Sequence, residues 1–233
     1  YQTNPPTDKL PSLYPTTIVN GGQYRGALYD MQNKFNLNNL ADPKQRDGFT
    51  NLLKTILPSS QNPVLLAAAI SNWVSPSGQF PLADDLAYKK AGLPAAPHRF
   101  MLNISELRNV AGINAALYQL LLHYVTVLPR KDTPLNINTA ITADLITTGK
   151  NISLTTAKAI ANARPYLSDT DIAANPTIKI HPEMASQLTT TSEFFVARSL
   201  VQLGDQQLLN NSFINRNKST GKTRVLWQTQ GGN

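Results

Sequence analysis

The sequence predicts an α+β protein in which strands from both ends of the chain form one antiparallel sheet, interrupted by a long helical region. Apolar residues alternate with period two near the front, from Gln23 to Gln32, and again over residues 195–229. Between these segments they recur at helical spacing. A lone front strand would leave its backbone groups unpaired, so we expect it to pair with the C-terminal strands.

The N-terminal segment precedes this first strand. Residues 1–17 contain Pro5, Pro6, Pro11 and Pro15 among polar residues, which predicts an extended linker or a docked tail. We therefore expect residues 1–34 to comprise a linker and the first strand of the sheet.

One short sequence motif, called the asparagine phrase below, occurs twice. Apolar residues alternate with asparagine in Phe35–Leu40 (FNLNNL) and in Leu135–Ala140 (LNINTA), and helical spacing follows each copy. Asparagine and threonine favour the residue before a helix, because their side chains accept hydrogen bonds from the first free N–H groups. We expect each phrase to lead from a strand into a helix, with its amides turned outward or capping that helix.

The region from residue 35 to residue 192 is predicted to be a helical insertion domain. Pro58 ends the first helix, and Pro63 begins the second, at the position in a first turn where proline is tolerated. Ser105 and Asn114 are predicted N-caps of later helices. The predicted helices span residues 49–57, 64–74, 84–91, 104–110, 114–125, 142–147, 155–163 and 182–188.

Residues 193–233 are predicted to complete the sheet. Strands are expected at residues 195–203, 207–215 and 223–229. Gly204-Asp205 and Ser219-Thr220-Gly221 lie between them, where hairpin turns belong.

Composition excludes several functions. The 233 residues contain no cysteine, which rules out disulfides, thiolate nucleophiles and zinc sites that need sulfur. Charged residues make up only 15% of the chain, and the formal charge of +7 is scattered without a long basic run. Neither a G-x-S-x-G nor an H-E-x-x-H motif occurs. We therefore assign no catalytic residue and expect no enzyme.

Several longer sequence motifs resemble those of one protein family. They are Tyr24-Arg25-Gly26, Lys34–Leu40, Ala68–Val74, Glu106–Val110, Tyr124–Pro129 and Leu135–Ala140. Together they are similar to the K-type minor pseudopilin of the bacterial type II secretion system, also called general secretion pathway protein K. The pairing of FNLNNL with LNINTA about a hundred residues later is the most specific feature, and the resemblance covers nearly everything after residue 20.

The resemblance implies a pilin-like sheet interrupted by a large α domain, and a transmembrane helix that precedes Tyr1. It implies anchoring in the inner membrane before assembly, with the soluble domain in the periplasm. It also implies a place at the pseudopilus tip with I-type and J-type minor pseudopilins, in support of protein export. Such a protein acts by assembly, and no nucleic-acid partner is expected.

The resemblance also implies calcium binding, but the acidic motif is degraded here. Ser75 and Ser77 stand where family members carry aspartates after the tryptophan, and only Asp84 and Asp85 keep negative charge. Calcium requires six to eight oxygen ligands, several of them anionic. These aspartates predict at best a weak calcium site; the competing interpretation is that they begin a helix and complement its dipole.

An alternative function is nucleic-acid binding. The second phrase and the helices after it resemble half of a helix-hairpin-helix module, with Lys150, Lys158 and Arg164 as candidate phosphate ligands. The intervening turn, residues 149–153, lacks the Gly-apolar-Gly core that lets backbone approach phosphate closely. The competing interpretation is a structural helical hairpin.

The C-terminal strands are predicted to form an interaction surface. Apolar residues there alternate with cations. This pattern suits either a partner subunit or a face covered by the missing N-terminal helix. The apolar members are Phe213, Ile214, Val225, Leu226 and Trp227, and the cations are Arg198, Arg216, Lys218, Lys222 and Arg224.

Overall fold

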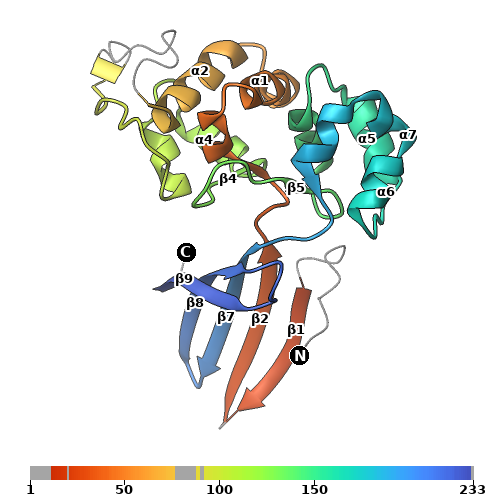
Figure 1. Cartoon of the computed structure of the whole chain (residues 1–233). Coiled ribbons are helices and arrows are strands. Elements are labelled where there is room, and N and C mark those ends of the chain that lie inside the picture. Colours follow the sequence, from red (N-terminus) through yellow and green to blue (C-terminus); the bar gives the residue numbers. More distant parts are fainter. Residues whose placement is uncertain (1–11, 20, 77–87, 90–91, 232–233) are drawn as a thin grey trace.

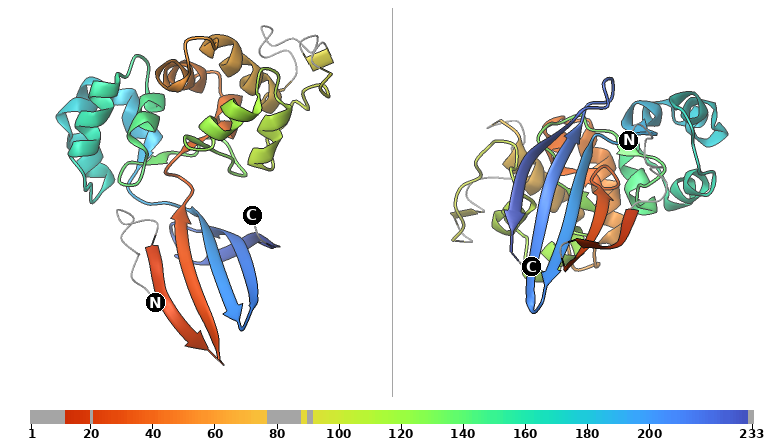
Figure 2. Two further views of the ribbon diagram at one scale, coloured as in Figure 1. Left: turned by 180° about the vertical axis from the view of Figure 1, so that it is seen from behind. Right: turned by 90° about the horizontal axis from the view of Figure 1, so that it is seen from below.

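The structure is a computed structural model that describes residues 12–19, 21–76, 88–89 and 92–231. It contains a five-stranded antiparallel sheet with the helical region standing at one end of the strands (Figure 1). The strand order is β1 (Ser12–Val19), β2 (Gly22–Asp30), β7 (Phe194–Leu203), β8 (Gln206–Arg216) and β9 (Thr223–Gln230), visible side by side in Figure 2. None of the helices in the described residues has the length and apolar character needed to cross a membrane.

The central prediction, that the two ends of the chain share a ladder, is confirmed. β2 pairs with β7 along its length, from Gln23 opposite Gln202 to Asp30 opposite Phe195. The hairpins joining β7, β8 and β9 turn at the predicted residues. The helical region therefore leaves the sheet after β2 and returns at β7.

The N-terminal segment differs from its prediction. Residues from Ser12 onward form β1, an edge strand paired with β2, rather than a linker that reaches residue 17. Pro15 lies within the irregularity of register between Tyr14 and Thr17. An edge strand tolerates proline at such a point, because no ladder hydrogen bond depends on its missing N–H.

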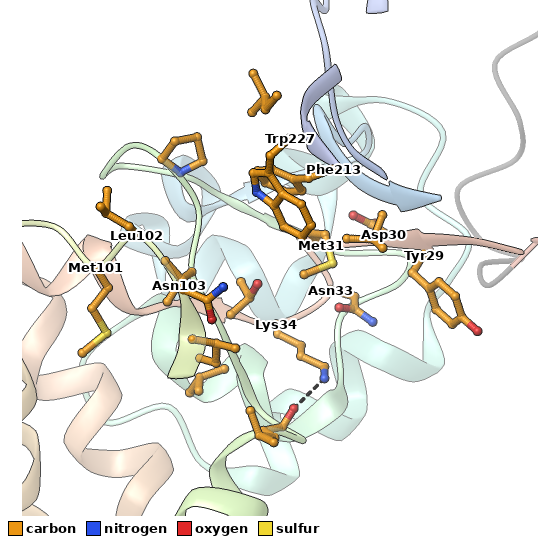
Figure 3. Close-up of a pocket in the computed structure, with 18 of the residues that line it drawn as sticks. Tyr29, Asp30, Met31, Asn33, Lys34, Met101, Leu102, Asn103, Phe213 and Trp227 are labelled. Carbon is orange, nitrogen blue, oxygen red and sulfur yellow. Dashed lines mark hydrogen bonds between the residues drawn. The ribbon is translucent and has the colours of Figure 1, made fainter. Parts of the chain in front are cut away.

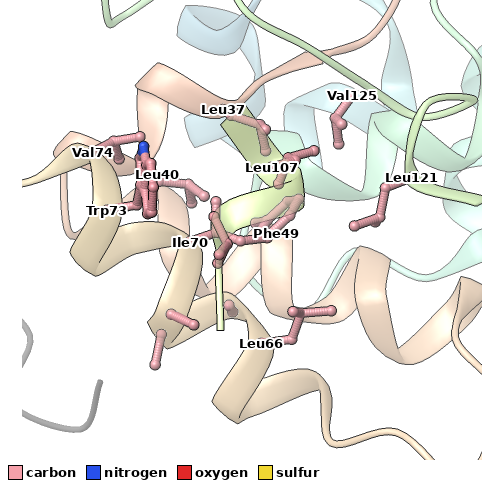
Figure 4. Close-up of a cluster of buried hydrophobic side chains, with 14 of the residues drawn as sticks. Leu37, Leu40, Phe49, Leu66, Ile70, Trp73, Val74, Leu107, Leu121 and Val125 are labelled. Carbon is pink, nitrogen blue, oxygen red and sulfur yellow. The ribbon is translucent and has the colours of Figure 1, made fainter. Parts of the chain in front are cut away.

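The helical region has two separate cores. Figure 4 shows the first, in which Phe49, Ile70, Trp73 and Leu121 are buried against one another. It is built from the 3₁₀ helices η2 (Leu37–Ala41) and η3 (Ile104–Asn109) and the α-helices α1 (Gln45–Ile56), α2 (Pro63–Val74) and α4 (Ala115–Leu121). The second is built from η4 (Thr142–Thr148), α5 (Leu154–Asn162), α6 (Asp169–Ala174), α7 (Pro176–Ile180) and η5 (Pro182–Gln187).

Local signals placed most helices correctly. α1 ends before Pro58, and α2 begins at Pro63 with the Asn62 side chain accepting hydrogen bonds from its first turn. Asn114 caps α4 as predicted, whereas Asn103, not Ser105, caps η3. The predicted helices at 104–110, 142–147 and 182–188 are 3₁₀ helices, because each is a short connector that tightens into i to i+3 hydrogen bonds.

Other helix predictions were incomplete. The helix predicted over 114–125 ends at Leu121, and Val125 and Thr126 form the short strand β4. α6 and α7 were missed because each has only five or six residues, too few to show periodicity. The helix predicted at 84–91 lies mostly outside the described residues; Tyr88 and Lys89 within it are helical.

The two asparagine phrases open two units of the same design. β3 (Phe35–Asn36) continues into η2 and pairs in parallel with β4 (Val125–Thr126). β5 (Leu135–Asn136) precedes η4 and pairs in parallel with β6 (Leu188–Thr189). The predicted passage from strand to helix is confirmed in both copies. In each unit, a later strand pairs with the first strand of that unit.

The asparagines of the first phrase point inward, so of the two expectations, amides turned outward or capping the helix, the capping one is confirmed at Asn36. Asn36 and Asn38 are at most 2% exposed. The Asn36 Oδ1 accepts hydrogen bonds from the backbone N–H groups of Asn38 (3.2 Å) and Leu128 (3.0 Å), and its Nδ2 donates to the Arg130 carbonyl (2.7 Å). This amide caps η2 and at the same time holds a segment about ninety residues away in the sequence.

Three more asparagines each hold one backbone segment by a two-way pair. Each side chain donates to a carbonyl and accepts from the N–H of the same distant residue, as a neighbouring strand would. The pairs are Asn38 with Met101, Asn39 with Thr133 and Asn138 with Tyr166.

Asp30, the last residue of β2, joins the sheet to the second unit. Its carboxylate accepts from Thr139 Oγ1 (2.5 Å), Ser192 Oγ (2.7 Å), Asn136 Nδ2 (3.2 Å) and the Gln32 N–H (2.8 Å). Burial raises the pKa of Asp30 above its ordinary value, and the four hydrogen bonds partly offset this by stabilising the charged form. The carboxylate thus lies at the junction of β2, β5 and the segment that enters β7.

Asp144 of η4 is a second buried carboxylate, and it lacks such partners. It is 0% exposed, and neither of its side-chain oxygens has a hydrogen-bond partner among the described residues. Burial raises its pKa well above the ordinary value, and the positive charge of Lys34 opposes that rise. The charged form of Asp144 is therefore costly in the folded protein.

We expect Asn36→Ala to lower the free energy of unfolding by roughly 2–4 kcal/mol, because it leaves buried N–H and carbonyl groups without partners. Urea unfolding followed by circular dichroism measures the change. Asn162→Ala, at an exposed position on α5, is the matched control and should change stability little. Equal stability of the two variants would contradict the role of the Asn36 amide.

We expect Asp144→Asn to stabilise the protein increasingly as pH rises. Because the folded-state pKa lies above the unfolded value of 3.8, the stability that protonated Asp144 contributes is present below pH 3.8 and is lost as pH rises through the folded-state pKa. Asparagine mimics the protonated form at every pH. The difference in unfolding free energy between variant and wild type should grow as pH rises above about 4 and level off once pH passes the raised folded-state pKa. A flat difference, like that expected for Asp205→Asn in the exposed β7–β8 turn, would refute it.

Candidate functional site: two surfaces of the sheet

One face of the sheet carries no charge along its exposed length. In an antiparallel ladder, directly opposed residues share a face, so the register defines this uncharged face. Its residues are Tyr14, Tyr24, Gly26, Leu28, Ala197, Ser199, Val201, Leu203, Leu208, Asn210 and Ser212. Five of them, including Tyr14 at 53% and Leu208 at 48%, are exposed large apolar residues. An apolar face of this kind costs little to desolvate and is typical of an interaction surface.

Small residues run along the middle of the uncharged face. Gly26 lies beneath two aromatic rings, since a Cβ there would come within 3.2 Å of the Tyr24 hydroxyl and 3.4 Å of the Tyr14 ring. Ser199 and Asn210 lie opposite Gly26 on the next two strands. The two tyrosine side chains thus cover the centre of this face at Gly26.

The opposite face of the sheet forms one wall of a hydrophobic groove of about 810 Å³ (Figure 3). Sheet residues Val196, Phe213, Leu226 and Trp227 line that wall. The other wall comes from the helical region and the segments that lead into it. Its residues are Met101, Leu102, Asn103, Ile104, Leu122, Val125, Thr126, Val127 and Pro129, and the lining is completed by Tyr29, Asp30, Met31, Asn33, Lys34 and Arg198.

Stacked aromatic rings organise the sheet wall of the groove. Phe213 stacks on Phe194 at a centroid distance of 5.9 Å and on Trp227 at 5.4 Å. Leu128 is buried with this stack and joins it to the helical region. Trp227 remains 43% exposed at the end of the stack, so its ring faces the groove as well as the protein.

The predicted C-terminal surface is divided between the two faces. Phe213, Leu226 and Trp227 line the groove, whereas Ile214 and Val225 oppose each other on the other side of a bulge. Its apolar residues therefore do not form one patch.

Two of the cations predicted at this surface form hydrogen bonds within the fold. Arg216 Nη2 donates to the Ser192 carbonyl (2.9 Å), and Lys218 Nζ donates to Thr189 Oγ1 (3.0 Å). These two cations attach the β8–β9 hairpin to the segment that leaves the second unit. Of the predicted set, Arg198 lies at the groove.

Lys34 lies on the helical side of the groove. Its Nζ donates to the Leu122 carbonyl at 2.6 Å (Figure 3). Burial lowers the pKa of Lys34, and the neighbouring Asp144 raises it. The ammonium group uses one N–H in this bond and keeps donors for another acceptor.

The predicted calcium site lies mostly outside the residues that the structure describes. Asp84, Asp85 and Ser77 lie outside them. Ser75, at the end of α2, is buried, and its hydroxyl donates to the Leu40 carbonyl (3.4 Å). Where the chain is described, no three histidine, aspartate or glutamate side chains come together as a metal site would need.

The contacts of the predicted helix-hairpin-helix residues favour the structural interpretation. Lys150 Nζ lies 3.2 Å from Asp47 Oδ2, and Arg164 Nη2 donates to the Ala140 carbonyl (2.8 Å). The Glu183 side chain lies against the turn, since a Cβ on Gly149 would meet its Oε1 at 2.8 Å. A carboxylate at that point opposes the approach of phosphate.

Known proteins match both the sequence and the fold. The family model for protein K of the type II secretion system matches residues 33–130. A type II secretion system protein K from Aeromonas hydrophila is 30% identical, over 92% of this chain and 72% of that protein. Another, from Klebsiella pneumoniae, is 30% identical over 87% and 68%.

The fold matches a chain in the crystal structure of the GspK–GspI–GspJ complex from the type 2 secretion system of enterotoxigenic Escherichia coli. The TM-score is 0.76 at 25% identity, over 94% of this chain and 83% of that one. The match spans the sheet and both units of the helical region. The chain therefore belongs to the type II secretion system protein K family, whose members are structural, non-enzymatic minor pseudopilins.

Proposed function

We propose that this protein assembles with I-type and J-type minor pseudopilins at the tip of the pseudopilus and so supports protein export. The observation that carries the proposal is the fold match over 94% of the chain to a structure solved as a GspK–GspI–GspJ complex. The two exposed surfaces of the sheet support it, because an assembly protein needs apolar surface that its own fold leaves uncovered.

We propose that the uncharged face receives a helix. Exposed apolar side chains, among them Tyr14, Leu203 and Leu208, give this face the apolar surface that an apolar helix would cover. A helix preceding Tyr1 could pack on these side chains without burying any charge of the exposed part of the face. We further propose that such a helix anchors the protein in the inner membrane before assembly, with the folded part in the periplasm.

The helical region is proposed to set the position in the fibre. We propose a division into residues 1–34, 35–192 and 193–233, of which the middle part is the insertion domain. It stands at one end of the sheet, with its two units side by side (Figure 1). Its bulk would leave no room for a further subunit on that side, which accounts for a place at the tip.

We expect the chain to form a soluble complex with the I-type and J-type ectodomains of its own organism. The uncharged face and the groove become buried in assembly, so mixing the three proteins should give one complex by size-exclusion chromatography with light scattering. The major pseudopilin ectodomain from the same organism serves as the comparison. Separate elution of all three minor pseudopilins would count against the proposed function.

We expect a variant without the helical region to be incorporated along the pseudopilus and not only at its tip. Because the Met31 N–H bonds to the Phe194 carbonyl (3.0 Å), a hairpin loop of about two to four residues can replace residues 32–192. Asp30→Asn should accompany it, since Asp30 loses Thr139, Asn136 and Ser192 as donors. Immunogold labelling of pseudopili should place this variant along the fibre. A variant with a folded sheet that still labels only tips would contradict the proposal.

A further inference from the structure

We propose that the hydrophobic groove binds an apolar, carboxylate-bearing polypeptide segment of a partner protein, lying along the free edge of β9. The proposal rests on the proposed function in one respect: it takes the partner to be another pseudopilin. Apolar surface, positive charge and an open sheet edge all meet at this groove.

Apolar side chains from both walls of the groove are exposed to solvent. Leu102 on the helical side is 78% exposed, and Trp227 on the sheet side is 43% exposed (Figure 3). At about 810 Å³ the groove lies in the range of roughly 300–1,000 Å³ typical of binding pockets. Burying a tryptophan and a leucine against a partner supplies the kind of anchor contact that dominates binding energy.

The charges that line the groove are unbalanced. Arg198 donates from Nε to Asn211 Oδ1 (3.1 Å) and lies over the Tyr29 ring, and Lys34 donates to a carbonyl. Asp144 is the acidic neighbour of Lys34, but neither Lys34 nor Arg198 forms an ion pair within 4.0 Å among the described residues. The carboxylate of Asp30, which also lines the groove, is already held by four donors. The free hydrogen-bonding capacity at the groove is therefore cationic, which suits an incoming carboxylate.

The edge of β9 favours a polypeptide over a lipid. β9 is the last strand of the sheet and pairs only with β8 among the described residues. Leu226 and Trp227, which line the groove, belong to this edge strand. Its outward N–H and C=O groups can pair with a polypeptide but only in part with a lipid, because only a polypeptide adds a complementary ladder.

Site-specific photo-crosslinking in the full-length protein in secreting cells tests the occupant. A benzoylphenylalanine in place of Leu102 should give adducts whose mass-spectrometric mapping identifies an apolar segment containing Asp or Glu from a pseudopilin. The matched control replaces Leu167, which is 84% exposed on the second unit. Adducts no more abundant than at position 167, or adducts with lipid, would overturn the proposal.

Charge and polarity variants separate this proposal from the proposed function. Leu102→Asp and Arg198→Glu should each weaken binding to the I-type and J-type ectodomains by about tenfold or more, whereas Leu167→Asp and the conservative Arg198→Lys should bind nearly as wild type. Thermal melting confirms that each variant is folded. If wild type forms the complex and both groove variants bind equally well, the groove proposal fails and the proposed function stands.

The converse failure is also distinct. If wild type forms no complex with these partners, the proposed function fails, and the mapped adducts from position 102 still decide the groove. Adducts that map to an apolar acidic segment of another pseudopilin, such as the major one, would then support the groove proposal, and adducts only with other proteins, or none, would refute it.

Discussion

Buried side-chain amides and one buried carboxylate hold this protein in its shape. Asn36 and Asn136 occupy equivalent places in the two units, and each caps the turn that follows it while bonding to a distant segment. Asn136 reaches both Asp30 and Ser192, the residues at which the chain leaves the sheet and returns to it. A buried polar network of this kind is stabilising only when nearly every member is satisfied, so it selects one arrangement of the helical region over others.

The network matters because only two connections join the sheet to the helical region. One runs from β2 into β3, and the other from β6 into β7. Two covalent connections leave freedom of rotation, which the Asp30 cluster and the packing of Leu128 against Phe194 and Phe213 remove. The groove between sheet and helical region owes its definite walls to these contacts, and with them its capacity to recognise a partner.

The folded structure explains why the chain contains few charged residues. Polar uncharged residues supply both the internal amide pairs and the centre of the uncharged face. A surface that must be covered during assembly avoids charges that would be buried unpaired. Three charged residues are exceptions: Asp144 is buried beside Lys34, and Lys34 and Arg198 bring two cations to the lining of the groove.

Sequence patterns within a short window predicted much of the fold. Period-two alternation identified β2 and β7 to β9, and Pro58, Pro63 and Asn114 marked helix ends, because these signals depend only on residues within one turn or strand. The doubled asparagine phrase also revealed the repeated step from strand to helix. The family resemblance also rested on short sequence motifs of this kind.

Tertiary structure decided what the remaining residues do. The inward direction of the asparagines depends on distant partners, such as Arg130 at 94 residues from Asn36, which no local pattern specifies. The groove is a further case, since Leu102 and Trp227 line the same groove only because the helical region is fixed above the sheet. The sequence by itself determined the elements and their order; long-range hydrogen bonds and packing decided which surfaces were left exposed for assembly.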